Sequence, residues 1–306
     1  MGKIALLFPG QGTQVTGMGK DFYDNYDSAK EVYEIAGEAT GIDVAGLCFN
    51  EDERLNITEY TQIALLTTEV AILKTLTDMG LKADYLSGLS LGEYGALAAA
   101  QVMDYKDLFK VIKNRGKFMQ DAYPVGGAMT AVLGLDADKI KQVCESVDGI
   151  VSIANDNCPG QIVITGEEKA VAKAGELLAA EGAKRCIPLK VSGPFHSALL
   201  KGAGEQLAEV LAPITIKDPV IPYISNVTAD VVADCKEIKN LLAAQVYSPV
   251  RFRESVLRMQ ALGVTDFIEI GPGKTMSGFV RKTDRELNVV NVEKIEDIEN
   301  VRKYFS

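Results

Sequence analysis

The chain has 306 residues, 47% hydrophobic and 24% charged, a balance that excludes a disordered chain, and this length suggests about two domains. The 32 Lys and Arg residues against 42 Asp and Glu give a formal net charge of −10, which argues against a nucleic-acid partner because an acidic surface repels phosphates. The five cysteines show no C-x-x-C spacing, which is typical of free thiols in a reducing compartment.

The first predicted element is a β-strand, Ile4 to Phe8. Pro9-Gly10 ends this apolar run at once, so it is too short for the apolar segment of a signal peptide. No window reaches the roughly 18 apolar residues that cross a bilayer. We therefore expect a cytoplasmic protein with no membrane partner.

Short apolar runs then alternate with amphipathic stretches, which is the pattern of an α/β domain with a parallel sheet. Further strands are expected at Tyr85 to Ser87, Phe267 to Ile270 and Val289 to Val292, and helices at Ala29 to Ala39, Gln62 to Met79, Glu93 to Met103 and Asp107 to Met119.

The order of predicted strands and helices changes between Gly126 and Val191. The expected elements are strand Ala128 to Leu133, helix Asp138 to Ser146, strands Ile150 to Ala154 and Gln161 to Thr165, helix Glu168 to Glu181 and strand Lys184 to Pro188. This βαββαβ order is that of a ferredoxin-like unit. We predict an inserted ferredoxin-like subdomain at 125–192 within a discontinuous α/β catalytic domain formed by 1–124 and 193–306.

Gly88-Leu89-Ser90-Leu91-Gly92 lies between a predicted strand and a predicted helix. A G-x-S-x-G sequence in this context forms a nucleophile elbow, in which glycines permit a strained turn that exposes the serine. Ser90 is therefore a candidate nucleophile. The alternative is an ordinary serine at a helix terminus.

His196 is the only histidine of the chain. A serine hydroxyl needs a base, usually histidine, to take its proton, so a His-activated Ser90 would require His196. The competing interpretation is a hydrogen-bonded structural histidine. The surrounding loop, where the chain returns to the main domain, favours an active-site position.

Pro9-Gly10-Gln11-Gly12 follows the first predicted strand directly. Backbone N–H groups there could point into the crevice at the carboxyl end of the sheet and form an oxyanion hole. A plain tight turn explains the glycines equally well. The segment lacks the full glycine pattern of a dinucleotide site and the lysine of a phosphate-binding loop.

Arg115 lies late in a predicted helix of an acidic protein. Its planar guanidinium can hold a carboxylate through two parallel hydrogen bonds, which lysine cannot do. A solvated arginine on a helix surface is the alternative.

Nine segments, in order along the chain, resemble the malonyl-CoA:acyl carrier protein transacylase family. They are FPGQGTQ from Phe8, TEYTQIALL from Thr58, GLSLGE from Gly88, RGKFMQ from Arg115, NDNCPGQIVITG from Asn155, GPFHSALL from Gly193, SNVTA from Ser225, QVYSPVRF from Gln245 and EIGPGKTMSG from Glu269. A collinear set is far more specific than any one segment. The family fold is an α/β-hydrolase-like core with an inserted ferredoxin-like subdomain.

The resemblance implies roles for the catalytic candidates. Ser90 would carry the malonyl group as an ester, and His196 would act as base and then as acid. Gln11 and Leu91 would supply the oxyanion-hole N–H groups. The family usually has His before the nucleophile, whereas this chain has Leu89, so no role passes to that position.

The resemblance also implies the binding residues. Arg115 would clamp the free malonyl carboxylate, and a main-chain carbonyl at Gln245 would orient His196 in place of a triad carboxylate. Asn155 aligns with a pocket position, as does Ser225-Asn226. Phe195 resembles a malonyl-type signature in which a bulky ring excludes an α-methyl group.

The expected reaction is transfer of malonyl from malonyl-CoA to the pantetheine thiol of an acyl carrier protein, for fatty acid or polyketide synthesis, with no cofactor and no metal. We expect a monomer whose partners are those two substrates. Two rivals stay open: a serine esterase or thioesterase that shares the elbow, and a binding module without catalysis. The esterase order places His near the C-terminus, whereas more than a hundred residues follow His196.

Overall fold

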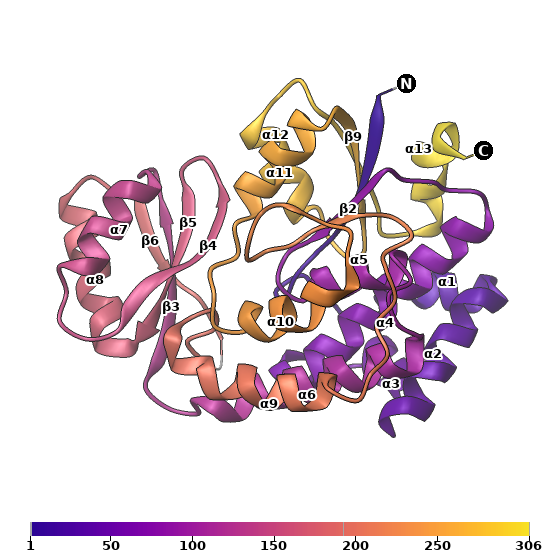
Figure 1. Ribbon diagram of the computed structural model, residues 1–306, viewed down its shortest axis with the longest axis horizontal. Helices are drawn as coiled ribbons and strands as arrows, with labels where there is room; N and C mark the ends of the chain where they lie inside the picture. Colours follow the sequence, from indigo (N-terminus) through magenta and orange to yellow (C-terminus); the bar gives the residue numbers. More distant parts are fainter. Residues whose placement is uncertain (1, 192, 306) are drawn as a thin grey trace.

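The computed structural model describes residues 2–191 and 193–305, and these residues form two β-sheets (Figure 1). The larger sheet has six strands in the order β10-β9-β1-β2-β7-β8. Its neighbours are parallel except for β8, which is antiparallel to β7. The strands are β1 (Lys3–Phe8), β2 (Tyr85–Gly88), β7 (Tyr223–Ile224), β8 (Val231–Val232), β9 (Val264–Ile270) and β10 (Asn288–Val292).

Strand β1 is central to this sheet, and both of its faces are buried. Leu6 and Phe8 belong to one hydrophobic cluster, together with residues of α4 (Thr58–Asp78) and α5 (Gly92–Ala99). Ala5 and Leu7 belong to another, with residues of α11 (Phe252–Ala261) and α12 (Thr275–Thr283). Helices on both faces explain why β1 has a continuous apolar sequence instead of an alternating one. The four strands predicted for this sheet are confirmed.

The remaining helices surround this layered core. Figure 1 shows α1 to α4 together on one side and α11 and α12 at the other. The other main-domain helices are α1 (Lys20–Asn25), α2 (Asp27–Thr40), α3 (Val44–Phe49), α6 (Tyr105–Ala122), α9 (Lys201–Leu211), α10 (Cys235–Gln245) and α13 (Ile298–Val301). Within the described ranges, no helix has the length and apolarity needed to cross a bilayer.

The smaller sheet is built from the segment predicted as βαββαβ. Its elements are β3 (Gly127–Leu133), α7 (Ala137–Glu145), β4 (Val151–Cys158), β5 (Gln161–Glu167), α8 (Glu168–Ala180) and β6 (Arg185–Pro188). The strand order is β4-β5-β3-β6, and each neighbouring pair is antiparallel. Helices α7 and α8 cover one face, while Met129 and Ala131 join the core of the larger domain. The predicted element order is confirmed; the boundary at 192 lies outside the described residues, and the domain division stays a prediction.

Several predicted elements have different ends in the structure, and for two of them the contacts explain the difference. The helix expected to reach Met103 ends at Ala99, because the chain turns at Gln101, whose φ is 55°. The strand expected to end at Ala154 continues to Cys158. There β4 stays paired with β5 through Asn155 and Asp156. The N–H of Asp156 also donates to the carbonyl of Val250 at 2.9 Å, so the strand continues through polar residues.

Candidate active site

The predicted elbow is present between β2 and α5. Ser90 lies at its tip with a φ of 55°, a left-handed conformation that non-glycine residues rarely adopt. A Cβ added at Gly88 would lie 2.0 Å from the carbonyl carbon of Gly92, and one added at Gly92 would lie 1.8 Å from the carbonyl oxygen of Phe8. The turn is therefore pressed against the end of β1, and both positions require glycine.

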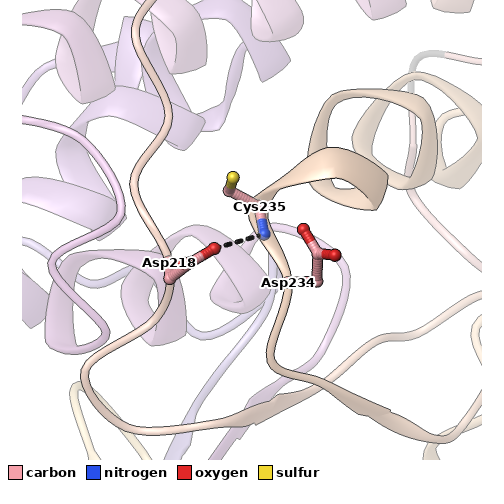
Figure 2. Close-up of side chains that lie close together, drawn as sticks. All are labelled: Asp218, Asp234 and Cys235. Atoms are coloured by element: carbon pink, nitrogen blue, oxygen red, sulfur yellow. Dashed lines mark hydrogen bonds between the residues drawn. The ribbon is translucent and has the colours of Figure 1, made fainter.

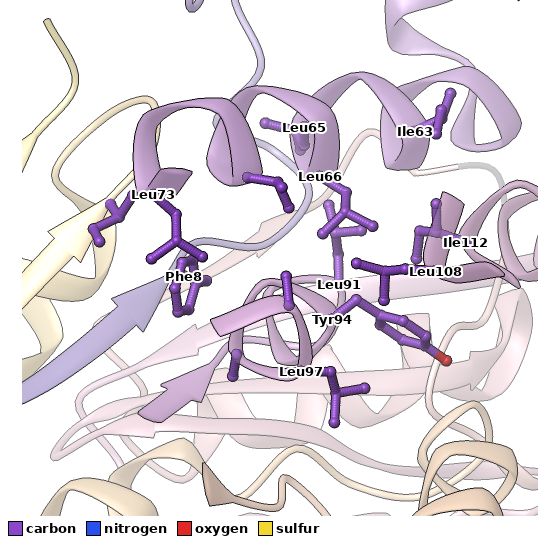
Figure 3. Packing of buried hydrophobic residues seen from close by; sticks show 14 of the residues in the cluster. Phe8, Ile63, Leu65, Leu66, Leu73, Leu91, Tyr94, Leu97, Leu108 and Ile112 are labelled. Atoms are coloured by element: carbon purple, nitrogen blue, oxygen red, sulfur yellow. The ribbon is translucent and has the colours of Figure 1, made fainter. Parts of the chain in front are cut away.

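Helix α5 is held firmly behind the elbow. Figure 3 shows Leu91, which precedes this helix, and Tyr94 and Leu97 within it among side chains of α4 and α6. These three residues are almost fully buried. Tight packing of this kind fixes the position of the helix, so it also fixes the serine at its start.

Ser90 and His196, which are 106 residues apart in sequence, meet in the structure. Ser90 Oγ lies 2.8 Å from His196 Nε2, and His196 Nδ1 lies 2.8 Å from the main-chain oxygen of Gln245. A carbonyl can only accept, so Nδ1 carries the proton of the neutral ring. Nε2 therefore presents its lone pair to the serine hydroxyl, which is the tautomer that a general base needs.

The surroundings of His196 keep its ring neutral. Burial, and secondarily the positive charge of Arg115, lower its pKa from 6.5 to about 4. The hydrogen bond to the Gln245 carbonyl opposes this shift but does not overcome it. At neutral pH the ring is therefore unprotonated and can accept the serine proton.

Arg115 on α6 is buried beside the same hydroxyl. Its Nη2 donates to Ser90 Oγ at 3.1 Å and to Gln245 Oε1 at 2.9 Å, and its Nη1 donates to Gln62 Oε1 at 2.7 Å. The guanidinium lies 5.3 Å from the centre of the Tyr94 ring. Its Nε has no hydrogen-bond partner within the described part of the chain. All acceptors in contact with this cation are neutral, so it can take an anionic group of a ligand.

The loop after β1 packs against the elbow. A Cβ at Gly10 would lie 2.5 Å from the carbonyl oxygen of Leu89, so the two backbones touch. The N–H groups of Gln11 and Leu91 donate to no acceptor among the described residues, while the Gln11 side chain donates to Thr58 Oγ1 at 3.1 Å. Two free N–H groups beside a serine match an oxyanion hole.

Two predicted binding residues do not join this hydrogen-bonded group. Asn155 lies on β4, where its neighbours pair with Val250, and no hydrogen bond links it to Ser90, His196 or Arg115 in the described structure. Phe195 precedes His196 and is buried. The structure thus brings together Ser90, His196, Arg115 and Gln245, which we call the catalytic cluster, with Gln11 and Leu91 beside it.

Sequence reasoning missed two polar residues and assigned a third only loosely. Gln62 and Glu93, which were not predicted, contact Arg115 and Gln245 respectively. Asn226, predicted only as a pocket residue, accepts a hydrogen bond from the N–H of Ser90 at 2.7 Å. The available signal for Glu93 was a single glutamate in an otherwise uncharged helix, since such a residue is rarely buried without a specific partner. Helix α4 contains many other polar residues, so Gln62 gave no such signal.

One group in the described residues could offer three metal ligands, namely Asp218, Asp234 and Cys235 (Figure 2). Asp218 accepts a hydrogen bond from the N–H of Cys235 at 2.9 Å, and Asp234 accepts one from the N–H of Lys236 at 2.9 Å. Both carboxylates therefore cap the start of α10. Asp218 also raises the pKa of the Cys235 thiol, which disfavours the thiolate that binds metals.

The chain is similar to known proteins over nearly its whole length. Residues 5–303 match the model of the acyl transferase domain. A malonyl CoA-acyl carrier protein transacylase of Bacillus subtilis (strain 168) is 50% identical over 304 residues, which is 98% of this chain and 96% of that protein.

The chain is also similar to solved structures of malonyl transacylases. The crystal structure of the malonyl CoA-acyl carrier protein transacylase from Clostridium perfringens is 44% identical and superposes with a TM-score of 0.95, covering 98% of this chain and 96% of that chain. A malonyl-transacylase in complex with a type II PKS acyl-carrier protein is 38% identical with a TM-score of 0.95, covering 98% and 99% of the two chains.

The low pKa of the histidine can be tested directly. The chain has one histidine, so its imidazole NMR signals need no assignment. We expect a titration midpoint near pH 4 because the ring is buried beside a cation. Arg115→Ala should move the midpoint upward, since the repelling charge is lost. A midpoint near 6.5 in both proteins would contradict this description of the site.

Proposed function

The chain belongs to the acyl transferase domain family, and from this we propose that it moves a malonyl group from malonyl-CoA to the pantetheine thiol of an acyl carrier protein. The observation that carries the proposal is the placement of one hydroxyl, Ser90 Oγ, 2.8 Å from His196 Nε2 and 3.1 Å from Arg115 Nη2. A nucleophile with its base lies beside a buried cation, which suits an acyl donor that ends in a carboxylate.

The first half-reaction loads the serine. Ser90 Oγ attacks the thioester carbonyl while its proton passes to His196 Nε2. The N–H groups of Gln11 and Leu91 stabilise the oxyanion of the tetrahedral intermediate. The carbon–sulfur bond then breaks, the CoA sulfur receives the proton from the imidazolium, and a malonyl ester of Ser90 remains.

The second half-reaction runs the same steps with a new thiol. His196 takes the proton of the pantetheine thiol, and the sulfur attacks the ester carbonyl. The carbon–oxygen bond of the ester breaks, and the imidazolium returns its proton to Ser90 Oγ. Atoms and protons balance with the two substrates and these residues, so the scheme uses no cofactor.

Arg115 gives the site its preference for a dicarboxylic acyl group. In this proposal the malonate carboxylate takes the guanidinium donors, including Nε, which lacks a partner among the residues described. A charge-assisted pair in a buried site fixes the acyl chain and orients its carbonyl. An acetyl group has no carboxylate and would gain nothing from this contact.

Carrier docking requires a cationic surface, because acyl carrier proteins are acidic in general and this chain is acidic as well. On α6, the Lys110 and Lys117 side chains already pair with carboxylates, and Lys113 donates to the Thr40 carbonyl. On α12, Arg281 donates to the carbonyl of Val289, near the start of β10. In the parallel sheet, Val289 lies level with the start of β2, whereas the elbow follows the end of β2.

The segment around β6 is a better docking surface. Lys184, Arg185 and Lys190 are exposed and form no ion pair within the described ranges. Ile187 and Leu189 beside them are 42% and 37% exposed, which adds apolar area to the cationic edge. The same segment leads within a few residues to His196. We therefore propose that the carrier docks on this edge strand.

The remaining attributes belong to the same proposal. The cysteines are free in the structure, which fits a reducing compartment, and we assign the enzyme to the cytoplasm. The monomeric state stays a prediction.

Intact mass spectrometry tests the ester. Incubation with malonyl-CoA should add one malonyl group that maps to the peptide of Ser90, and Ser90→Ala should carry none. Addition of a holo acyl carrier protein should discharge the ester onto the carrier. Release of free malonate without carrier acylation would indicate a thioesterase, and the absence of any adduct would indicate a binding module.

Replacing the clamp should change acyl selectivity. Arg115→Ala is expected to lower kcat/KM for malonyl transfer by about 100-fold, the loss of a buried charge-assisted contact, and to leave acetyl transfer unchanged or faster. Competing malonyl-CoA and acetyl-CoA in one assay gives the ratio directly. An equal decrease for both acyl groups would assign Arg115 a structural role.

Charge reversal tests the docking surface. Lys184→Glu combined with Lys190→Glu should raise the KM for the carrier by about 10-fold, with little change in the KM for malonyl-CoA. The matched control is Lys110→Glu with Lys117→Glu, on the helix whose lysines are already paired. A similar effect of both double variants would remove the β6 edge as the docking surface.

A further inference from the structure

Glu93 is a fully buried carboxylate that the reaction scheme does not use. It follows the nucleophile by three residues, in a helix whose other residues are glycine, tyrosine, alanine and leucine. Its Oε2 accepts hydrogen bonds from Gln245 Nε2 at 2.6 Å and from the N–H of Asn226 at 3.1 Å. Its Oε1 has no partner among the described residues. Burying a charged group costs free energy, so a buried carboxylate that is retained suggests a function.

The carboxylate is one of four groups that set the orientation of the Gln245 amide, and it makes the shortest contact. The amide nitrogen faces three acceptors: Glu93 Oε2 at 2.6 Å, Ser90 O at 2.9 Å and Asn226 Oδ1 at 3.2 Å. The amide oxygen faces Arg115 Nη2 at 2.9 Å. A flipped amide would set oxygen against acceptors and N–H groups against a guanidinium, so both ends would repel.

Asn226 holds the other side of the nucleophile. Its Oδ1 accepts from the N–H of Ser90 at 2.7 Å, and its Nδ2 donates to the carbonyl of Gly88 at 2.7 Å. With the Gln245 amide on the Ser90 carbonyl, both peptide groups of the serine are bonded. These bonds stabilise a backbone conformation that is otherwise strained.

We propose that Glu93 is a positioning residue for acyl transfer, which orients the Gln245 amide and the Asn226 main chain and thereby holds Ser90 and Arg115. The inference rests on the proposed function, because it assigns Glu93 to that reaction. Without the carboxylate, the Gln245 amide loses its shortest hydrogen bond and is held less firmly, so a rotated amide becomes accessible. The Ser90 carbonyl then keeps only the main-chain N–H of Glu93, at 3.2 Å, as a donor, and Arg115 loses an acceptor.

The position of Glu93 also makes the site sensitive to pH. Burial raises its pKa to about 7, although the hydrogen bonds from Asn226 and Gln245 and the charge of Arg115 oppose this. The other titratable groups that face it are Tyr94 and Tyr223, whose pKa values burial raises, so both stay neutral. As the pH falls through about 7, Glu93 takes a proton and its hold on the amide weakens.

Three variants separate positioning from general destabilisation. E93L removes both acceptors, and E93Q keeps an acceptor of the same shape without the charge. The matched control is E69Q, at another fully buried glutamate that forms no hydrogen bond with the described residues and lies outside the catalytic cluster. Thermal unfolding of each variant reports whether the protein stays folded.

In E93L we expect kcat for malonyl transfer to fall by about 100-fold, and in E93Q by about 10-fold, in line with a lost charged hydrogen bond. The malonyl-to-acetyl ratio should fall in both, because Arg115 loses its alignment. This ratio does not depend on the fraction of folded protein. In wild-type protein, kcat for malonyl transfer should decrease as the pH falls through about 7. This decrease should be absent from E93Q, and E69Q should behave as wild type.

The outcomes distinguish this inference from the function on which it rests. If wild-type protein forms no malonyl ester, the proposed function fails first. If wild type forms the ester but both Glu93 variants keep its malonyl-to-acetyl ratio, the positioning role is wrong. A decrease in rate near pH 7 that persists in E93Q would overturn it as well.

Discussion

The active site depends on a neutral acceptor behind the histidine. A main-chain carbonyl, from Gln245, holds His196 Nδ1 at 2.8 Å. A carbonyl fixes the tautomer as a carboxylate would, but it adds no negative charge to stabilise the imidazolium. The burial of the ring and the nearby Arg115 can therefore lower its pKa to about 4. At neutral pH the ring is therefore uncharged, with Nε2 unprotonated. Arg115, the second cause of the lowered pKa after burial, also lies 3.1 Å from the serine hydroxyl.

Gln245 links the parts of the site that come from different elements. Its carbonyl contacts His196, its amide oxygen contacts Arg115, and its amide nitrogen contacts the main chain of Ser90. One residue at the end of α10 thus sets the relative positions of base, cation and nucleophile. The elbow glycines and the tightly packed α5 hold Ser90 in the position where these contacts form.

The parts of the fold and of the active site that depend on a few adjacent residues could be predicted from the sequence. The apolar run of β1 and the elbow around Ser90 were correctly placed, because each depends on a few adjacent residues. The contact between Glu93 and Asn226 was not predicted, because it joins segments 133 residues apart. Strand β7, with two residues, is too short to show a pattern. Strand β4 is longer than predicted, because polar residues that show no apolar pattern still pair with β5.

The insertion of the smaller sheet has a mechanical consequence. The chain enters this sheet from α6, which carries Arg115, and leaves it through β6 toward His196. Arg115 and His196, which lie before and after the insertion in the sequence, both contact Ser90 Oγ. A displacement of the inserted sheet would therefore act on both side chains that contact the serine hydroxyl.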